Sequence, residues 1–504
     1  MELMCIVTTA LIAVIFALLY RYLTANYGYW QERRILVPSG IVPGFGHMLP
    51  TFTMKKSVAE MMEDIHKAFP KSSMVGIYML RKPVLVVRDA ELVKTVLQTE
   101  FNNFRHHQTL DNIIDPLMDQ NPFFLNDQKW KDARSVLLST MTSKKLKTLS
   151  LVLRDGCSKF VKYLNNQLEG KQSIDVEGKP LFKRVTVEVS ANAVLSVEEG
   201  MFNDDSPKIF KSMMETIFVP STLQTLKGIA FFFFPMLNTF FGTSFVPQWV
   251  SKRFTKIVNN LIDERENGMT KREDVLQHLT EYCAGKNLSR SSVISNVFSF
   301  FLESYETSTL TMSFLACDLA KYPEVQSKVR KEIETVASRF GGEVSYEAIS
   351  EMTYLDQVIS ESTRLHPIAG ALRKFCSEET ELVGSDGLRH KMKPGDEVML
   401  SIYGLHKDPD YWDRPDEFRP ERFDKESQEC KQRHNYVFLP FSEGPRQCPG
   451  MRMAMLVVKM VFVNILRNFV IEKSPKLREP IVLDPMSLMP YIKGGAWIRL
   501  RRLH

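Results

Sequence analysis

The segment from Phe441 to Gly450 surrounds a single cysteine with residues typical of a tight turn. It reads Phe-Ser-Glu-Gly-Pro-Arg-Gln-Cys-Pro-Gly, and an apolar helical run follows it. Glycine and proline allow the backbone to approach the sulfur of Cys448, and a helix amino terminus lowers the pKa of a thiol. Such a thiolate could bind a metal ion as a ligand. The alternative is a buried structural thiol in a turn.

Two further pairs have helical spacing. Glu361 and Arg364 are three residues apart, so a carboxylate and a guanidinium share one helix face, an arrangement that is common on protein surfaces. Trp130 and Arg134 are four residues apart and could form a cation–π pair. Arginine also offers a fixed fork of donors to a carboxylate ligand.

A long helix is predicted where Gly and Pro are absent, from Ser291 to Tyr322. It would contain about 32 residues and measure roughly 48 Å. Within it, Glu306 and Thr307 place an acid beside a hydroxyl, which can relay protons through water. Glu303 lies one turn before Thr307 on the same face.

The remaining elements must position these residues, and most of the chain has helical periodicity. The pattern predicts two strands within Met74–Val87, strands at Glu397–Tyr403 and Ala496–Leu500, and a long Pro-rich loop over Lys407–Leu439. Helices are predicted at Glu324–Val336, Tyr354–Leu365 and Met451–Phe469, and from about Asp127.

Composition excludes several classes of protein. The net charge of +6 over 504 residues, without a basic stripe interleaved with aromatics, does not suggest nucleic-acid binding. The seven cysteines are odd in number and widely spaced, which argues against a disulfide framework and a CxxC zinc site. The length would allow two domains, but no linker or internal repeat divides the chain, so one large domain around a cofactor is expected.

The amino terminus carries a candidate membrane anchor. Leu3–Tyr20 is an uncharged apolar stretch of 18 residues, followed by Arg21, Arg33 and Arg34. Positive charge on this flank keeps the body of the protein cytosolic, whereas a cleaved secretory signal would carry its charge before the apolar stretch. The predicted organisation is an anchor over residues 1–24, a Pro/Gly-rich linker over 25–50 and a catalytic domain over 51–504. A second apolar patch around Phe231–Pro235 is either core or membrane-dipping surface.

The cysteine segment resembles the haem-binding signature Phe-x-x-Gly-x-Arg-x-Cys-x-Gly of the cytochromes P-450. The resemblance implies a mainly α fold with small β-sheets, in which haem b lies between the long central helix and the cysteine loop. It makes Cys448 the axial ligand of the haem iron. Phe441, Gly444 and Arg446 are the matching signature residues, and Arg446 is expected to contact a haem propionate.

Further matches extend the resemblance along the chain. Trp130 and Arg134 match a pair that binds the other propionate, and a third contact is expected from Arg373 or Lys374. Glu361–Arg364 and Pro420–Phe423 match segments whose carboxylate and two arginines, including Arg422, hold the long loop beneath the haem, a structural role. Tyr29–Arg34 and Arg272–Gln277 resemble the xenobiotic-metabolising microsomal clan of insect type.

The long helix both matches the family and departs from it. Glu306 and Thr307 match the proton-relay pair. Ser304 replaces the usual glycine, and Glu303 replaces the small residue that faces the iron. A carboxylate there must be protonated, hydrogen-bonded to a group such as Ser304 or water, or esterified to a haem methyl as in the family's fatty-acid ω-hydroxylases.

The resemblance implies a haem-thiolate monooxygenase acting on a lipophilic substrate such as a xenobiotic, steroid or fatty acid. Electrons would come from NADPH through the cytochrome P-450 reductase, with cytochrome b5 as a second partner, at the cytosolic face of the endoplasmic reticulum membrane. Lys131, Arg433, Arg446 and Arg452 are candidate contacts for the acidic surface of the reductase. A P-450 isomerase or dehydratase, and a non-catalytic haem sensor or carrier, are the alternatives. Neither the substrate nor the oligomeric state follows from the sequence.

Overall fold

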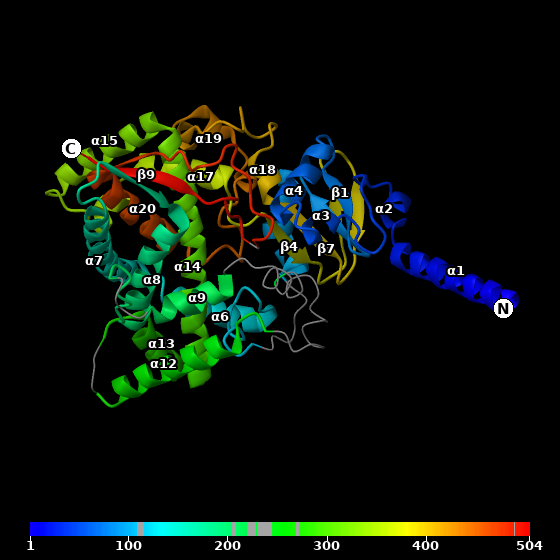
Figure 1. Cartoon of the computed structure of the whole chain (residues 1–504), viewed down its shortest axis with the longest axis horizontal. Coiled ribbons are helices and arrows are strands. Elements are labelled where there is room, and N and C mark those ends of the chain that lie inside the picture. The colour runs from blue at the N-terminus through cyan, green and yellow to red at the C-terminus, as the bar shows by residue number, and fades with distance from the viewer. Residues whose placement is uncertain are drawn as a thin grey trace. The chain divides into compact units, whose positions relative to one another are not determined.

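The computed structural model describes residues 1–107, 115–203, 208–218, 228, 244–268, 272–487 and 489–503. The chain divides into two compact units, each assembled from several segments (Figure 1). Unit 1 comprises Met1–His106, Ala369–Asp413 and His434–Phe438, and unit 2 comprises His107–Ile368, Arg414–Arg433 and Leu439–His504. Helices predominate over small sheets, which confirms the predicted fold class.

Unit 1 is built on a four-stranded sheet of order β1-β2-β7-β4, in which only the β2–β7 pair is parallel. β1 and β2 form the predicted hairpin, with Met79 opposite Lys82. The elements are α1 (Glu2–Thr24), α2 (Tyr29–Glu32), α3 (Leu49–Phe52), α4 (Val58–Ala68), β1 (Met74–Met79), β2 (Lys82–Val87), α5 (Ala90–Lys94), η1 (Thr95–Thr99), η2 (Phe101–Phe104), β4 (Ala371–Phe375), the hairpin β5 (Thr380–Val383) and β6 (Arg389–Met392), β7 (Glu397–Ser401), α18 (Ile402–His406) and η4 (Asn435–Val437).

The residues that follow α1 pack onto β1. Trp30 is buried, and its indole nitrogen donates to the carbonyl of Ile77 at 2.9 Å. Gly76 makes this contact possible, because a Cβ there would lie 2.3 Å from the Trp30 ring. The Pro/Gly-rich segment is therefore held against the sheet of unit 1.

Helix α1 is attached to the same sheet at its last turn. The guanidinium of Arg81, in the β1–β2 turn, lies 3.6 Å from the centroid of the Tyr22 ring. Asn26 Nδ2 donates to the Arg81 carbonyl at 3.0 Å. No residue of α1 is buried, and the helix is long and apolar enough to cross a membrane, with a mean hydropathy of 2.6.

Unit 2 is mostly helical and carries a three-stranded antiparallel sheet of order β3-β9-β8. Its elements are α6 (Asp127–Ser139), α7 (Ser143–Gln167), β3 (Ser173–Glu177), α8 (Gly178–Leu195), α9 (Ile209–Phe218), α12 (Gln248–Glu266), α13 (Val275–Gly285), α14 (Arg290–Lys321), α15 (Pro323–Arg339), α16 (Tyr346–Ser350), α17 (Thr353–Leu365), η3 (Pro420–Phe423), α19 (Gln428–Gln432), α20 (Met451–Asn468), β8 (Phe469–Lys473) and β9 (Trp497–Arg502).

Helix α14 is the predicted long helix and has 32 residues. Ser289 caps its start by accepting a hydrogen bond from the Ser292 N–H, and Pro323 begins α15 directly after its end. It is buried along most of its length and packs most extensively against α8 (Figure 1). The helix therefore carries polar side chains such as Glu303 and Glu306 deep into unit 2.

Two predicted segments, the long loop and the second apolar patch, are not confirmed directly. The segment Lys407–Leu439, predicted as an irregular loop, contains the short helices η3, α19 and η4. The apolar patch around Phe231–Pro235 lies outside the described residues.

Candidate active site

The cysteine loop is closed by its own backbone before α20. The Cys448 N–H donates to the Phe441 carbonyl at 2.8 Å, and the Gln447 N–H donates to the Gly444 carbonyl at 2.9 Å. Gly444 has a φ of +78°, which glycine adopts without strain. The backbone N–H groups of Gly450 and Met451 point at the sulfur and favour its ionised form. The loop thus holds the Cys448 sulfur among N–H donors that would stabilise a thiolate once a metal ion binds.

Burial dominates the electrostatics of this thiol. It raises the pKa of Cys448 to about 11, and the nearby Glu303 carboxylate raises it further, against the opposing effect of Arg134 and the backbone N–H groups. Cys448 keeps contact with solvent, although enough protein surrounds its sulfur to disfavour the charged form. A bound metal ion deprotonates such a thiol outright.

Two guanidinium groups lie near the cysteine loop, that of Arg446 buried and that of Arg134 half-buried. Arg446 is stacked 4.4 Å from the centroid of the Trp130 ring, and its Nη2 donates to the Leu125 carbonyl at 2.9 Å. Its Nε is buried without a hydrogen-bond partner. Arg134, on α6, donates to the Gln447 carbonyl at 2.8 Å and so connects α6 to the loop.

Burial lowers the pKa of both arginines, that of Arg446 to about 9. Within the described ranges, neither guanidinium forms an ion pair with a carboxylate side chain. The Asp127 carboxylate partly offsets the charge of Arg446, but burial remains the larger effect, and a ligand that supplies negative charge would stabilise such desolvated cations. Two propionates beside a thiolate ligand supply this charge, so the residues present fit haem b.

The third expected propionate contact belongs to unit 1. Arg373 Nε lies 2.6 Å from Glu397 Oε1, so this guanidinium already has an internal carboxylate partner. Lys374 is buried, with its ammonium 5.8 Å from the centroid of the Phe101 ring. A propionate contact from either residue stays a prediction.

The carboxyl group of Glu303 is held by an amide far away in the sequence. Asn121 Nδ2 donates to Glu303 Oε1 at 2.8 Å. Burial raises the pKa of Glu303 to about 7, while the Asn121 hydrogen bond opposes the shift. Ser304, the partner suggested by sequence, instead contacts Ser190 Oγ at 3.0 Å and the Phe301 carbonyl.

The adjacent relay residues point to different partners. Glu306 Oε1 lies 2.5 Å from Lys179 Nζ on α8, and Glu306 Oε2 is buried without a hydrogen-bond partner. Thr307 Oγ1 donates to the Glu303 carbonyl at 2.7 Å. Consecutive residues project about 100° apart around a helix, so the two side chains do not meet. Neither Lys179 nor Asn121 could be found from sequence, because nothing in the spacing links them to α14.

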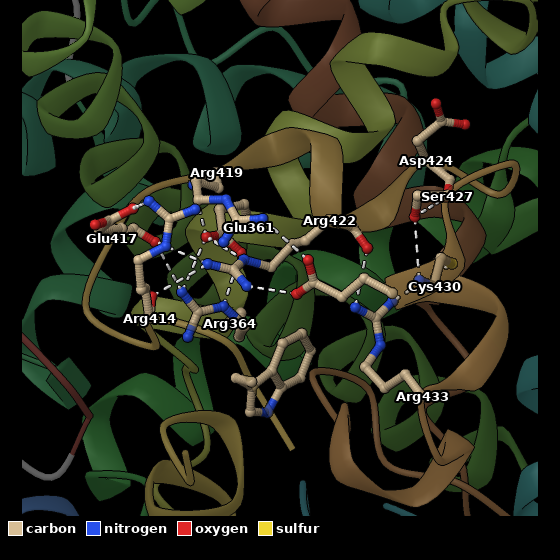
Figure 2. A network of polar contacts seen from close by, with 12 residues as sticks. Glu361, Arg364, Arg414, Glu417, Arg419, Arg422, Asp424, Ser427, Cys430 and Arg433 are labelled. Carbon is tan, nitrogen blue, oxygen red and sulfur yellow. Dashed lines mark hydrogen bonds and ion pairs between the residues drawn. The ribbon is translucent and has the colours of Figure 1, made fainter. Parts of the chain in front are cut away.

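The carboxylate–arginine cluster forms as expected and is larger than expected (Figure 2). Glu361, Arg364 and Arg422 have fully buried side chains, and Glu361 accepts from Arg364 Nε at 2.7 Å and Arg422 Nε at 3.0 Å. Glu429 Oε1 lies 2.6 Å from Arg422 Nη1, and Glu429 Oε2 lies 3.1 Å from Arg419 Nη2. Glu429 is a member that sequence analysis missed.

Comparisons with known proteins identify this arrangement. The Cytochrome P450 family model matches residues 37–496. The chain is 31% identical over 510 residues to probable cytochrome P450 28d2 of Drosophila melanogaster, covering 99% of this chain and 100% of that protein. It is 30% identical over 513 residues to cytochrome P450 6B1 of Papilio polyxenes, covering 98% and 99%. The chain therefore belongs to the cytochrome P450 family.

Family membership confirms a haem-thiolate monooxygenase with haem b as cofactor and NADPH as the indirect electron source. The insect origin of these relatives confirms the insect-type resemblance.

Proposed function

We propose that this monooxygenase inserts oxygen into a lipophilic organic substrate at a site formed by the cysteine loop and α14. The observation that carries this assignment is that Arg446 and Arg134, which form no ion pair with a carboxylate of the described residues, lie beside the loop that holds the Cys448 sulfur. When bound, the haem supplies the redox chemistry of O2 activation. The chain's residues hold the haem, orient the substrate and move protons.

Cys448 provides the thiolate, supported by Phe441 and Gly444 through the loop hydrogen bonds. Arg446, stacked on Trp130, and Arg134 donate to the propionates. These interactions would relieve the unfavourable burial of Arg134 and Arg446.

Proton transfer is assigned to Glu306 and Thr307. The free Oε2 of Glu306 can hold a proton while Oε1 stays with Lys179. Thr307 can pass a proton once its hydroxyl releases the Glu303 carbonyl. Because the side chains diverge, ordered water must join them.

We also propose a membrane location and electron-transfer partners for this protein. Residues 1–24 form the anchor, 25–50 the connection and 51–504 the catalytic domain, placed on the cytosolic face of the endoplasmic reticulum. The cytochrome P-450 reductase and cytochrome b5 deliver electrons, and exposed Lys131 and Arg452 suit acidic partners. The prediction that Arg446 contacts the reductase was wrong, because this residue is only 6% exposed.

The test combines a spectrum with turnover. The reduced, CO-bound protein should show the absorption band that names the family, and Cys448→Ser should abolish it. With reductase and a lipophilic substrate, NADPH consumption should accompany product formation. A band that persists in Cys448→Ser would contradict the ligand assignment. Product formed from a peroxide without NADPH would instead identify an isomerase or dehydratase.

A further inference from the structure

One oxygen of the Glu303 carboxyl group is bound and the other is available. Oε1 accepts the hydrogen bond from Asn121, and no residue that the structure describes donates to Oε2. Lysine, arginine and histidine side chains form no ion pair with Glu303 within the described ranges. The group is thus a half-buried carboxyl without a counterion among these residues.

The orientation of the carboxyl group is set by a buried amide. Asn121 is 1% exposed, and its Oδ1 accepts from the Phe123 N–H at 2.8 Å. This bond orients the amide so that its Nδ2 faces Glu303. Asn121 therefore holds one carboxyl oxygen in place and leaves the other available to a ligand.

The available oxygen belongs to the catalytic face of α14. Thr307 follows Glu303 by one turn and donates to its carbonyl. The charge of Glu303 acts directly on Cys448, the proposed iron ligand. A substrate group bound by Glu303 would accordingly lie beside the reacting centre.

We propose that Glu303 and Asn121 form a recognition subsite for the protonated nitrogen of a lipophilic amine, an inference that rests on the function proposed above. An ammonium group supplies both a hydrogen-bond donor to Oε2 and the missing positive charge. A neutral hydroxyl supplies only the donor. The subsite therefore favours cationic over neutral substrates of equal size.

The test compares two ligands of the same shape on full-length holoenzyme. N,N-dimethyldecylamine and 2-methyldodecane differ by a protonated nitrogen in place of a CH group. Their dissociation constants are measured from haem difference spectra. We expect the amine to bind at least about tenfold more tightly, because only the amine offers a charged donor to the Glu303 carboxylate. Glu303→Gln should reduce the ratio to about twofold or less, whereas exposed Glu264→Gln should preserve it.

A second variant guards against misfolding of the first. Asn121→Ala retains the carboxyl group but removes its donor, and should reduce the amine preference partially. Equal binding of the two ligands by the wild type would overturn the proposal. So would retention of the preference in Glu303→Gln, or a spectral shift showing that the nitrogen binds iron directly. Haem that cannot be extracted after turnover, with extraction restored in Glu303→Gln, would also overturn it by showing that Oε2 is esterified.

Failure of the subsite can be distinguished from failure of the proposed function. An intact CO band and NADPH-dependent oxidation of 2-methyldodecane would preserve the monooxygenase assignment even if the amine has no advantage. Loss of both would remove the assignment itself.

Discussion

The Glu429 carboxylate contacts Nη1 of Arg422 at 2.6 Å, whereas Glu361 contacts Nε of the same guanidinium at 3.0 Å. Glu361, Arg364 and Arg422 are fully buried and together carry one excess positive charge. Glu429 adds a second carboxylate beside Arg422 and also pairs with Arg419. Its negative charge therefore offsets part of the positive charge that the arginines bring to this cluster.

Glu429→Gln should destabilise this cluster. Because Glu429 is 25% exposed, we expect a loss of about 1–2 kcal/mol in unfolding free energy, less than for a fully buried pair. Thermal unfolding of the holoenzyme measures the loss of stability. The fraction of protein whose CO complex lacks the absorption band of the native enzyme measures the loss of native haem ligation. Glu426→Gln is the matched control, since Glu426 is 85% exposed and its carboxylate pairs with Lys431 at 2.9 Å on the surface. Equal stability of the two variants would contradict this role of Glu429.

Lys179→Met should impair proton delivery. The substitution leaves the buried Glu306 carboxylate without its cation, so we expect product formation to fall by at least about tenfold, with a larger solvent isotope effect. Product yield per NADPH is the measurement. Lys162→Met changes an exposed lysine on α7 and should behave as wild type. A normal yield in Lys179→Met would exclude this ion pair from proton transfer.

Arg446→Leu should accelerate loss of haem. Removing the guanidinium deletes charge-assisted hydrogen bonds to a propionate, so we expect dissociation to be about tenfold faster or more. Transfer of haem to apomyoglobin gives the rate. Arg154→Leu, which alters a half-exposed arginine paired with Glu343 at 3.8 Å, is the control. Unchanged dissociation in Arg446→Leu would show that the propionate binds elsewhere.

Glu303 should change its protonation near neutral pH. Its pKa is raised to about 7, from about 4.3 in an unfolded chain, so between these values the folded protein keeps a proton that the unfolded chain has released. Relative to Glu303→Gln, stability should therefore fall as pH rises through this window and stay level above it. Infrared difference spectra of the wild type against Glu303→Gln should show the carboxylic acid band at about pH 6 and its loss by about pH 8. A carboxylate band already complete at pH 6 would contradict the shift.

Local patterns predicted the elements that depend on neighbouring residues. The absence of Gly and Pro predicted α14, and proline at 323 predicted the break before α15. The cysteine segment also formed the expected turn before α20.

Contacts between distant segments could not be predicted in this way. Lys179 and Asn121 reach α14 from elements far away in the chain, and their identities carry no periodic signal. Glu429 lies on a five-residue helix inside a segment that composition marks only as a loop. Pair contacts of this kind depend on tertiary packing, which one sequence does not encode locally.

The contact between Tyr22 and Arg81 makes α1 more than a tether. Asn26 also binds the Arg81 carbonyl, so two contacts join the end of α1 to the β1–β2 turn. Two contacts limit the rotation of the helix relative to this turn. Tilting of α1 in a bilayer would consequently turn the sheet of unit 1 with it. Removing residues 1–22 deletes Tyr22 and so breaks the aromatic half of this contact, and with it the mechanical link through which the proposed anchor would set the inclination of unit 1.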